Sequence, residues 1–538
     1  MSKYNYNYIR VTNSRNYNIY LRGKKKMSSN ANVTKKLTLV SLILMIFTSV
    51  YGFNNIPRSF YKMGYAAIPW YIISGITFFV PFALMMAEFG AAFKKEKGGI
   101  YSWMEKSVGA KFAFIGTFMW FASYVIWMVN VSSGIWVPIS NAIFGMDTTK
   151  DWAFLGIKGL TGPKTLGIMG IIWFIIVTYV STKGVDKIKK VTSVGGTAVV
   201  LINVVVLLGA IVVFVANGGH LAQPIEGLKS FTTTPNPKYA GNIISSFAFV
   251  VYALFAYGGI EAVGGLVDQT ENPEKTFPKA VMFAAAVIAV GYSLLILMVG
   301  VFTNWSAVMS VKGVTLGNAS YIVMSNLGYS LGHAFGASEA ASIALSHGVA
   351  RYIGLSMFLA LSGAFFTLCY APLKQMIDGT PEELWPGKLG KTRKEDGMPV
   401  NAMWIQCLFV VVMIALVSFG GNSMSKFWDI LVNMTNVAMT IPYMFLSIAF
   451  IYFKKKKDIE KPFEVFKNYG TALTWGVIVT LTVGFANFFS IIQPALQDND
   501  MATTLWQIAG PIFFGVVAVL MHWNYDRKVK AEGNKNAA

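Results

Sequence analysis

An interrupted apolar stretch between residues 242 and 266 carries the residues best suited to hold a polar solute. Its first part is apolar enough to sit in lipid, and Tyr257, Gly258 and Gly259 then break the run just before a carboxylate at Glu261. A bilayer offers no hydrogen bonds to free backbone groups, so a helix that breaks at membrane depth must be shielded by protein or line a wet cavity. The N–H and C=O groups of such half-helix ends hold polar substrates in transporters. The stretch therefore predicts a binding site within a membrane.

Glu261 adds a titratable group to this predicted site. An ionisable residue within the membrane costs about 2.5–3.5 kcal/mol to insert, so it usually faces protein or water and serves a function. Burial disfavours the charged form of a carboxyl group, and protonation can then bias two conformations that differ in proton affinity. We expect Glu261 to act in proton coupling or gating and transport to depend on pH. Two alternatives stay open: Glu261 caps backbone N–H groups without changing charge, or the glycines only pack and Glu261 pairs with a neighbouring helix.

The composition is that of a membrane protein with many spans. Hydrophobic residues make up 54% of the 538 residues and charged residues only 13%, about half the charged share of a soluble protein. Cys369, Cys407 and four scattered histidines form no disulfide framework and no metal site. The sequence has no Ser/His/Asp constellation, and GGIEAVGG lacks the spacing of a nucleotide-binding glycine loop. We therefore expect no enzyme, no catalytic residues, no cofactor and no metal.

Twelve segments approach the roughly 20 predominantly apolar residues that a spanning helix needs. They are residues 37–58, 67–93, 112–140, 165–183, 191–216, 242–266, 280–303, 349–376, 400–420, 428–453, 471–493 and 505–525. With both termini in the cytoplasm, most of the 45 Lys and Arg fall on the cytoplasmic side, whereas Arg58 and Lys62 fall outside. This bias follows the positive-inside rule, so the net charge of +20 indicates topology rather than nucleic-acid binding.

The first predicted span is also interrupted, by Thr48, Ser49 and Gly52. The first and sixth spans stand five apart, at corresponding positions of two five-helix halves, which is the pattern of an inverted-repeat transporter with its site between the broken helices. We therefore predict an all-α fold of the LeuT-like type, with a 5+5 inverted repeat plus two C-terminal helices. Its parts are a cytoplasmic tail (1–36), two repeats (37–216 and 217–453), two further helices (454–526) and a second cytoplasmic tail (527–538).

Two further positions stand out. Trp120, Tyr124 and Trp127 are spaced to share one face of the third span, and before any relatives are considered such a stripe is more often packing than a substrate-facing surface. Glu88 lies at the cytoplasmic end of the second span, where we expect it to cap backbone groups or pair with a lysine.

Several motifs together resemble the amino acid–polyamine–organocation superfamily of transporters. They are GGIYSW after MAEFG, and FAYGGIEAVGG followed by TENPEKTFPKA, and the pattern of spans is similar along nearly all of residues 35–530. Within the superfamily, the chain is most similar to bacterial inner-membrane transporters of the glutamate:GABA antiporter branch. The resemblance implies alternating access, with a substrate site at the two breaks and gates at Trp120 and Phe255. The implied binding residues are Thr48, Ser49, Val50, Gly52, Trp120, Phe255, Tyr257, Gly258 and Gly259, with Glu261 in proton-linked gating.

The chain departs from the superfamily pattern at two places. The Gly-Ser-Gly signature at the first break is replaced by Thr-Ser-Val-Tyr-Gly, and the fifth span has no lysine between Val191 and Asn217. Ser362 and Thr367 on the eighth span keep sodium coupling open beside proton coupling.

The leading hypothesis is a secondary transporter in the bacterial inner membrane that exchanges or imports an amino acid or related amine. The alternative is a transporter-like sensor that binds an amino acid without net transport. The expected partners are this small molecule and the lipid bilayer, with no nucleic acid. The sequence leaves open which amino acid is carried and whether transport is antiport or symport. It also leaves open whether the protein forms a homo-oligomer and whether translation starts at Met1 or Met27.

Overall fold

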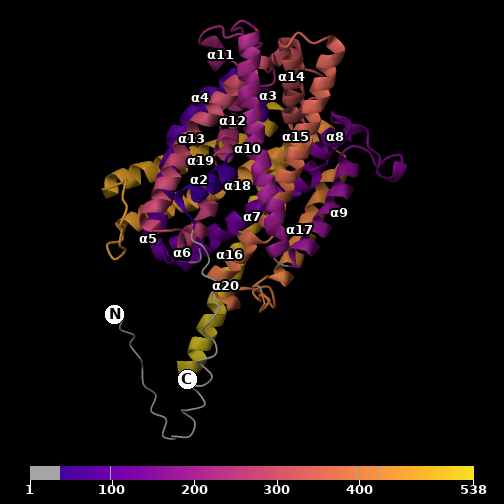
Figure 1. Cartoon of the computed structure of the whole chain (residues 1–538). Helices are drawn as coiled ribbons and strands as arrows, with labels where there is room; N and C mark the ends of the chain where they lie inside the picture. Colours follow the sequence, from indigo (N-terminus) through magenta and orange to yellow (C-terminus); the bar gives the residue numbers. More distant parts are fainter. Residues whose placement is uncertain (1–36, 97–98, 184, 396, 422, 538) are drawn as a thin grey trace, which may run out of the picture. The chain divides into compact units, whose positions relative to one another are not determined.

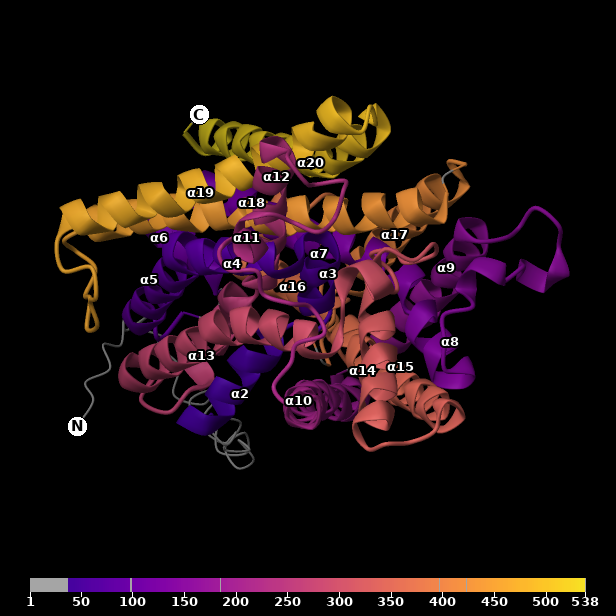
Figure 2. The same cartoon turned by 90° about the horizontal axis from the view of Figure 1, so that it is seen from above.

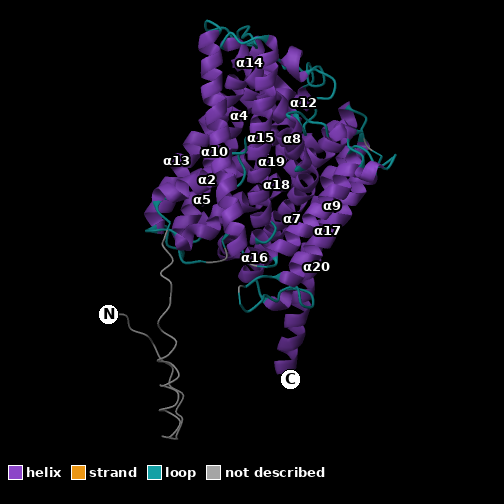
Figure 3. Ribbon diagram, turned by 45° about the vertical axis from the view of Figure 1, so that its right-hand side comes forward, coloured by secondary structure: helices purple, strands orange, loops and turns teal. Residues whose placement is uncertain are grey.

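The computed structural model describes residues 37–96, 99–183, 185–395, 397–421 and 423–537. Residues from Thr38 onward form one compact unit. Within the described residues the regular structure is helical, apart from isolated bridges such as the one between Ala153 and Thr161 (Figure 3). The predicted N-terminal tail, residues 1–36, and the choice between Met1 and Met27 lie outside the described residues.

The helical elements of the first half run from the first predicted span to the fifth. They are α2 (Leu39–Val50), α3 (Asn55–Met63), α4 (Ala67–Ser74), η2 (Gly75–Phe79), α5 (Val80–Ala92), α6 (Ile100–Ser107), α7 (Ala110–Gly134), α8 (Trp136–Phe144), α9 (Pro163–Ser181) and α10 (Val185–Ala216). Short turns are η1 (Gly64–Ala66), η3 (Thr149–Asp151) and η4 (Phe154–Gly156).

The second half begins with a short surface helix and ends with two long spans. Its elements are α11 (Lys229–Thr232), α12 (Ile243–Ala256), η5 (Ile260–Gln269), α13 (Pro273–Phe302), η6 (Trp305–Met309), α14 (Ala319–Ala334), α15 (Glu339–Leu368), α16 (Ala371–Gly379), η7 (Glu382–Leu384), α17 (Val400–Phe419), α18 (Met424–Lys455), α19 (Tyr469–Gln497) and α20 (Met501–Ala537). None of the twelve predicted spans includes α14.

Ten helices of the described residues are long and apolar enough to cross a membrane. They correspond to ten of the twelve predicted spans, and the other two predicted spans contain shorter apolar helices, α2 and the part of α10 from Val200 to Ala216. Large apolar side chains such as Leu208, Val290 and Leu408 are exposed on these helices. A water-facing surface rarely carries so many, whereas lipid chains can cover them. The structure is therefore that of an all-helical, multi-pass membrane protein.

The predicted first span, residues 37–58, is interrupted as expected, but the break lies a few residues later than Thr48 and Ser49. Thr48, Ser49 and Val50 are still helical, and the break lies at residues 51–54, between α2 and α3. The hydroxyl of Ser49 donates to the carbonyl of Met45 at 2.7 Å and so stays bonded within the helix. The next helix starts just before Pro57, which lacks an N–H and is tolerated in a first helical turn.

The helices present two opposite ends, which we call the α14 face and the α6 face. In Figure 1, α11 and α14 lie at the upper end, and α5, α6 and α16 lie toward the lower end. Seen from above, α7 and α18 pack against each other in the middle, and α19 and α20 run along one side (Figure 2). The two broken helices, α2–α3 and α12–η5, meet inside this bundle.

Candidate substrate site at two helix breaks

The breaks of the first and sixth spans touch through their backbones. Gly259 has a φ of +115°, and a Cβ atom there would lie 2.7 Å from the carbonyl oxygen of Ser49 and 3.6 Å from the Cα of Val50. Only glycine tolerates both this backbone conformation and this approach. Residues 48–52 and 256–260 therefore lie side by side, as the sequence analysis expected.

Tyr292 of α13 joins the two breaks. Its buried hydroxyl lies 2.9 Å from the amide nitrogen of Gly52, 3.1 Å from the carbonyl oxygen of Val50 and 2.8 Å from that of Ala256. A hydroxyl has one proton to donate, so it accepts from Gly52 and donates to one carbonyl at a time. Its ring stacks on Tyr51 at 4.5 Å between centroids. The sequence analysis missed Tyr292, whose signal is a tyrosine in the middle of the seventh apolar span.

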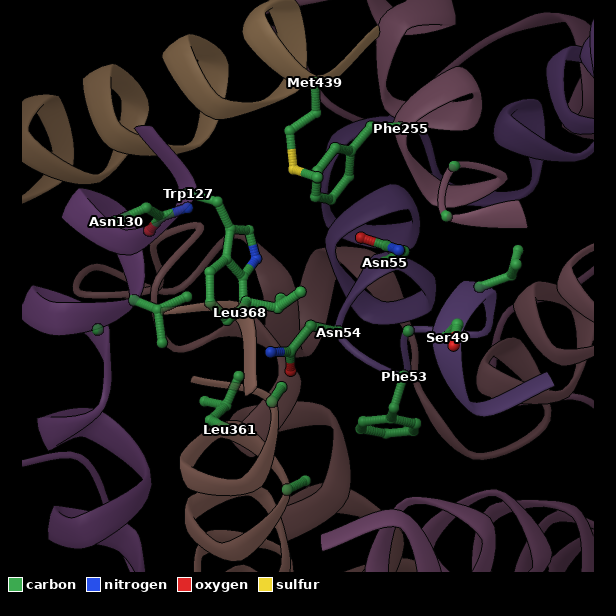
Figure 4. Close-up of a pocket in the computed structure, with 18 of the residues that line it drawn as sticks. Ser49, Phe53, Asn54, Asn55, Trp127, Asn130, Phe255, Leu361, Leu368 and Met439 are labelled. Atoms are coloured by element: carbon green, nitrogen blue, oxygen red, sulfur yellow. The ribbon is translucent and has the colours of Figure 1, made fainter. Parts of the chain in front are cut away.

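A cavity of about 430 Å³ opens beside the two breaks (Figure 4). Figure 4 shows Phe255 and Met439 together at one edge, with Trp127, Asn54 and Asn55 extending toward the centre. Further lining comes from α3, α7, α15, α18 and the start of α14. These side chains include Arg58, Tyr124, Asn130, Tyr321, Met357, Leu361, Thr367, Leu368, Trp428 and Tyr443.

Most of the predicted binding residues line this cavity. They are Ser49, Val50, Gly52, Phe255, Gly258 and Gly259. Tyr257 does not line it: its hydroxyl donates to the carbonyl of Tyr71 at 3.1 Å and its ring stacks on Phe79. The side chain of Thr48 lies outside the described part of the structure.

Trp120 was expected at the cavity as a gate, and the structure places it elsewhere. It is buried, and its indole N–H donates to Oε1 of Glu261 at 3.3 Å. The cavity is lined instead by Tyr124 and Trp127, which lie one and two turns further along α7. Trp120, Tyr124 and Trp127 share one face of α7, as predicted. Which of them reach the cavity depends on how α7 is positioned along its axis relative to the breaks.

Glu261 is buried just beyond the sixth-span break and does not line the cavity. Its Oε2 accepts the backbone N–H of Gly259 at 3.0 Å, and Oε1 accepts the indole N–H of Trp120. Among the described residues, no Lys, Arg or His forms an ion pair with it. This geometry matches the capping alternative, since one oxygen satisfies a backbone donor that the break sets free.

Aromatic side chains pack against each other beside the cavity, at the sixth-span break. A Cβ atom on Gly258 would lie only 1.9 Å from the hydroxyl of Tyr443, so glycine lets this tyrosine approach the break. The ring of Tyr443 packs on Phe78 and Phe82 at about 5 Å between centroids. Toward the α14 face, the lining of the cavity reaches Arg58, Tyr321 and Trp428.

A buried ion pair closes the α6 face further out. Glu88 of α5 pairs with Lys454 of α18 at 2.9 Å, and the two side chains are 0% and 3% exposed. The other oxygen of Glu88 accepts the backbone N–H groups of Val465 and Phe466 at 2.6 and 2.7 Å. Glu88 thus has both of the roles expected of it, pairing with a lysine and capping backbone groups, and it fixes the linker between α18 and α19.

No group of three or more His, Cys, Asp and Glu within the described part of the chain is arranged to hold a metal ion. The lining of the cavity offers a solute backbone groups, carboxamides, hydroxyls and one guanidinium. Such groups bind and orient a molecule, which is the chemistry of a carrier.

A bundle of spanning helices with two of them broken at a shared cavity defines a membrane transporter. The chain belongs to the amino acid permease family, whose model matches residues 37–517. The chain is 52% identical to the inner membrane transporter YjeM of Salmonella typhimurium over 93% of this chain and 98% of that protein. It is 24% identical to the aspartate/glutamate permease AcaP of Lactococcus lactis subsp. cremoris over 91% and 94% of the two chains. It is 23% identical to the glutamate/gamma-aminobutyrate antiporter of Lactococcus lactis subsp. lactis, over 84% and 82%.

These findings confirm the resemblance to the superfamily and the expectation of a transporter rather than an enzyme. A small-molecule substrate and a lipid bilayer follow from membership of the family.

Proposed function

We propose that this chain is a secondary transporter that moves an amino acid or a related amine across the bacterial inner membrane by alternating access. The observation that carries the proposal is the cavity at the two touching breaks, bordered by the packed rings of Tyr443, Phe78 and Phe82. We infer that these rings close the cavity toward the α6 face. A carrier must expose one site to each side in turn, and a site that extends toward one face while packed shut at the other is one state of that cycle.

The broken helices suit the two ends of an amino acid. The carbonyl end of α2 carries partial negative charge, whereas the starts of α3 and of the turn at Ile260 carry partial positive charge. An ammonium group is stabilised by the first and a carboxylate by the second. Phe255 and Met439 border this position and supply apolar contact for a side chain.

We place the α6 face in the cytoplasm. The loops at this end carry most of the basic residues that follow residue 36, including the run from Lys454 to Lys457, and basic loops stay on the cytoplasmic side. The state described by the structure is then outward-facing.

Glu261 is the residue we assign to proton coupling. Trp120, Tyr124 and Tyr443 face it from α7 and α18, and no charged group of the described residues pairs with it. Protonation of the carboxyl group would weaken Oε2 as the acceptor for the N–H of Gly259, so the protonation state of Glu261 would affect the backbone at the sixth-span break.

Uptake of radiolabelled amino acids into proteoliposomes tests the proposed function. Each of the common amino acids is offered at two pH values, with and without a candidate substrate inside the vesicles. We expect saturable uptake of at least one amino acid, whereas saturable binding without flux would show a sensor and contradict the proposal.

A further inference from the structure

Arg58 lies on α3 just above the first break and lines the cavity. Asn54, Asn55 and Arg58 follow one another at helical spacing, so they face the same side of this segment. Four residues at about 1.5 Å each place the Cα of Arg58 about 6 Å from that of Asn54 along the axis. The guanidinium is therefore one helical turn away from the backbone groups of the break.

Within the part of the chain that the structure describes, most of the hydrogen-bond donors of Arg58 have no protein acceptor. A guanidinium has five N–H donors, and Nε uses one of them on the carbonyl oxygen of Leu316 at 2.8 Å. For the four donors on the two Nη atoms, the structure gives no acceptor and no carboxylate partner among the residues that it describes. Asp147, which lies near Tyr321 on the same side, is already bonded to Thr149 and Asn318.

The formal charge of the residues that line the cavity is positive. Among the lining residues, all of which belong to the described part of the chain, Arg58 is the only charged one. Asn54, Asn55 and Asn130 add neutral carboxamides, and Oδ1 of Asn54 is buried without a hydrogen-bond partner among the described residues. A half-buried cation without a counter-charge is costly in the empty protein, and an anionic ligand would remove that cost.

We propose that Arg58 binds a second, distal carboxylate of the substrate, so that the cavity selects acidic amino acids over their neutral amides and over amines. The inference rests on the proposed transport function and names the substrate class for the same cavity. The backbone groups at the breaks hold the α-amino and α-carboxyl groups, and the side-chain carboxylate reaches along α3 to the free Nη donors. The planar fork of arginine fits a carboxylate through two parallel hydrogen bonds.

The competing explanation is that Arg58 only ties α3 to the loop before α14. Its Nε bond to Leu316 is such a tether. Tyr61 makes a similar one, since its hydroxyl donates to the carbonyl of Val314 at 3.3 Å and it is not a lining residue. Tyr61→Phe therefore removes a tether to the same loop without changing the charge of the cavity, and serves as the matched control.

The experiment compares acids with their isosteric amides in proteoliposomes containing the full chain. KM is measured for glutamate against glutamine and for aspartate against asparagine in wild type, R58Q, R58K and Y61F. Loss of a charge-assisted hydrogen-bond pair costs about 10- to 100-fold in affinity. We expect wild type to favour the acids by that factor, R58Q to lose the preference with the amides unchanged, R58K to keep part of it, and Y61F to behave as wild type.

Three outcomes would overturn the inference. They are equal KM values for acid and amide in wild type, an equal loss for both in R58Q, and a preference of wild type for neutral or basic substrates. The wild-type competition decides the question even if R58Q does not fold. Absence of flux for every amino acid is a different result, because it rejects the proposed transport function itself.

Discussion

The hydroxyl group of Tyr292 connects the backbones of the two helix breaks. Backbone groups at a helix break lack their helical partners, and here one hydroxyl lies within bonding distance of groups from both broken helices. A single residue of α13 therefore couples two segments that are more than 200 positions apart in the chain.

Tyr292→Phe removes this hydroxyl and keeps the ring. We expect a loss of about 1–3 kcal/mol in stability, because a buried N–H and a carbonyl lose their partner, together with a lower transport rate. Thermal unfolding in detergent and uptake kinetics measure the two effects. Tyr71→Phe is the control, since Tyr71 is equally buried and bonds Ser59 rather than the breaks. Equal transport defects in both variants would argue against a special role for Tyr292.

Glu261→Gln separates the two roles left open for the carboxyl. The amide retains an oxygen that can accept the N–H of Gly259 but does not titrate. If protonation of Glu261 controls the conformation of the sixth-span break, uptake by the wild type changes between about pH 5 and pH 8. The variant then shows a flatter pH profile while still binding substrate. Identical pH profiles of wild type and variant would leave Glu261 with the capping role alone.

At the scale of elements, the linker between α18 and α19 is held by a residue of another helix. Glu88 bonds two backbone N–H groups of the linker as well as Lys454. In the proposed alternating-access cycle, an opening of the α6 face that moves α5 away from α18 would break these contacts.

Glu88→Ala is expected to release the linker. Breaking a buried ion pair costs about 3 kcal/mol or more when one charge is left behind, and the amides of Val465 and Phe466 lose their acceptor. Hydrogen exchange followed by mass spectrometry should show faster exchange over residues 463–468. Glu464→Ala removes only the second partner of Lys454 and serves as the control. Unchanged protection of the linker in Glu88→Ala would contradict the assigned role.

At the scale of the whole molecule, the orientation in the membrane fixes which side the described cavity faces. Both native cysteines, Cys369 and Cys407, are buried. A single introduced cysteine can therefore report the side of a loop with little background.

Lys312→Cys on the α14 face and Lys388→Cys on the opposite loop test this orientation, because both side chains are exposed. In intact cells whose outer membrane has been permeabilised, we expect a membrane-impermeant maleimide to label position 312 and not position 388. Disruption of the inner membrane should make position 388 reactive as well. Labelling of 388 alone in intact cells would reverse the assignment of the faces, and the described state would then be inward-facing.

The sequence by itself determined the class of the protein and the approximate place of its site. Long apolar segments and the two interruptions are local properties, since each follows from the hydrophobicity and the backbone freedom of a few consecutive residues. They predicted the contact between residues 48–52 and 256–260 without any knowledge of side-chain packing. The expectation that Glu88 caps backbone groups or pairs with a lysine also rested on local sequence, because a carboxylate at the cytoplasmic end of a span has basic loops nearby. Its partner, Lys454, comes from a distant part of the chain.

Only the tertiary structure decided which side chains reach the cavity. Trp120 and Tyr124 lie on one face of α7, yet only Tyr124 lines the cavity, because the position of α7 along the breaks is set by packing against α18. The sequence pattern placed Arg58 among the cations outside the membrane, whereas in the structure it lies on α3 and lines the cavity. Tyr292 lay unremarked in an apolar span, because its role depends on two backbone segments that meet only when α2, α12 and α13 pack together. Helix rotation and depth are properties of the whole bundle, and no short stretch of sequence contains them.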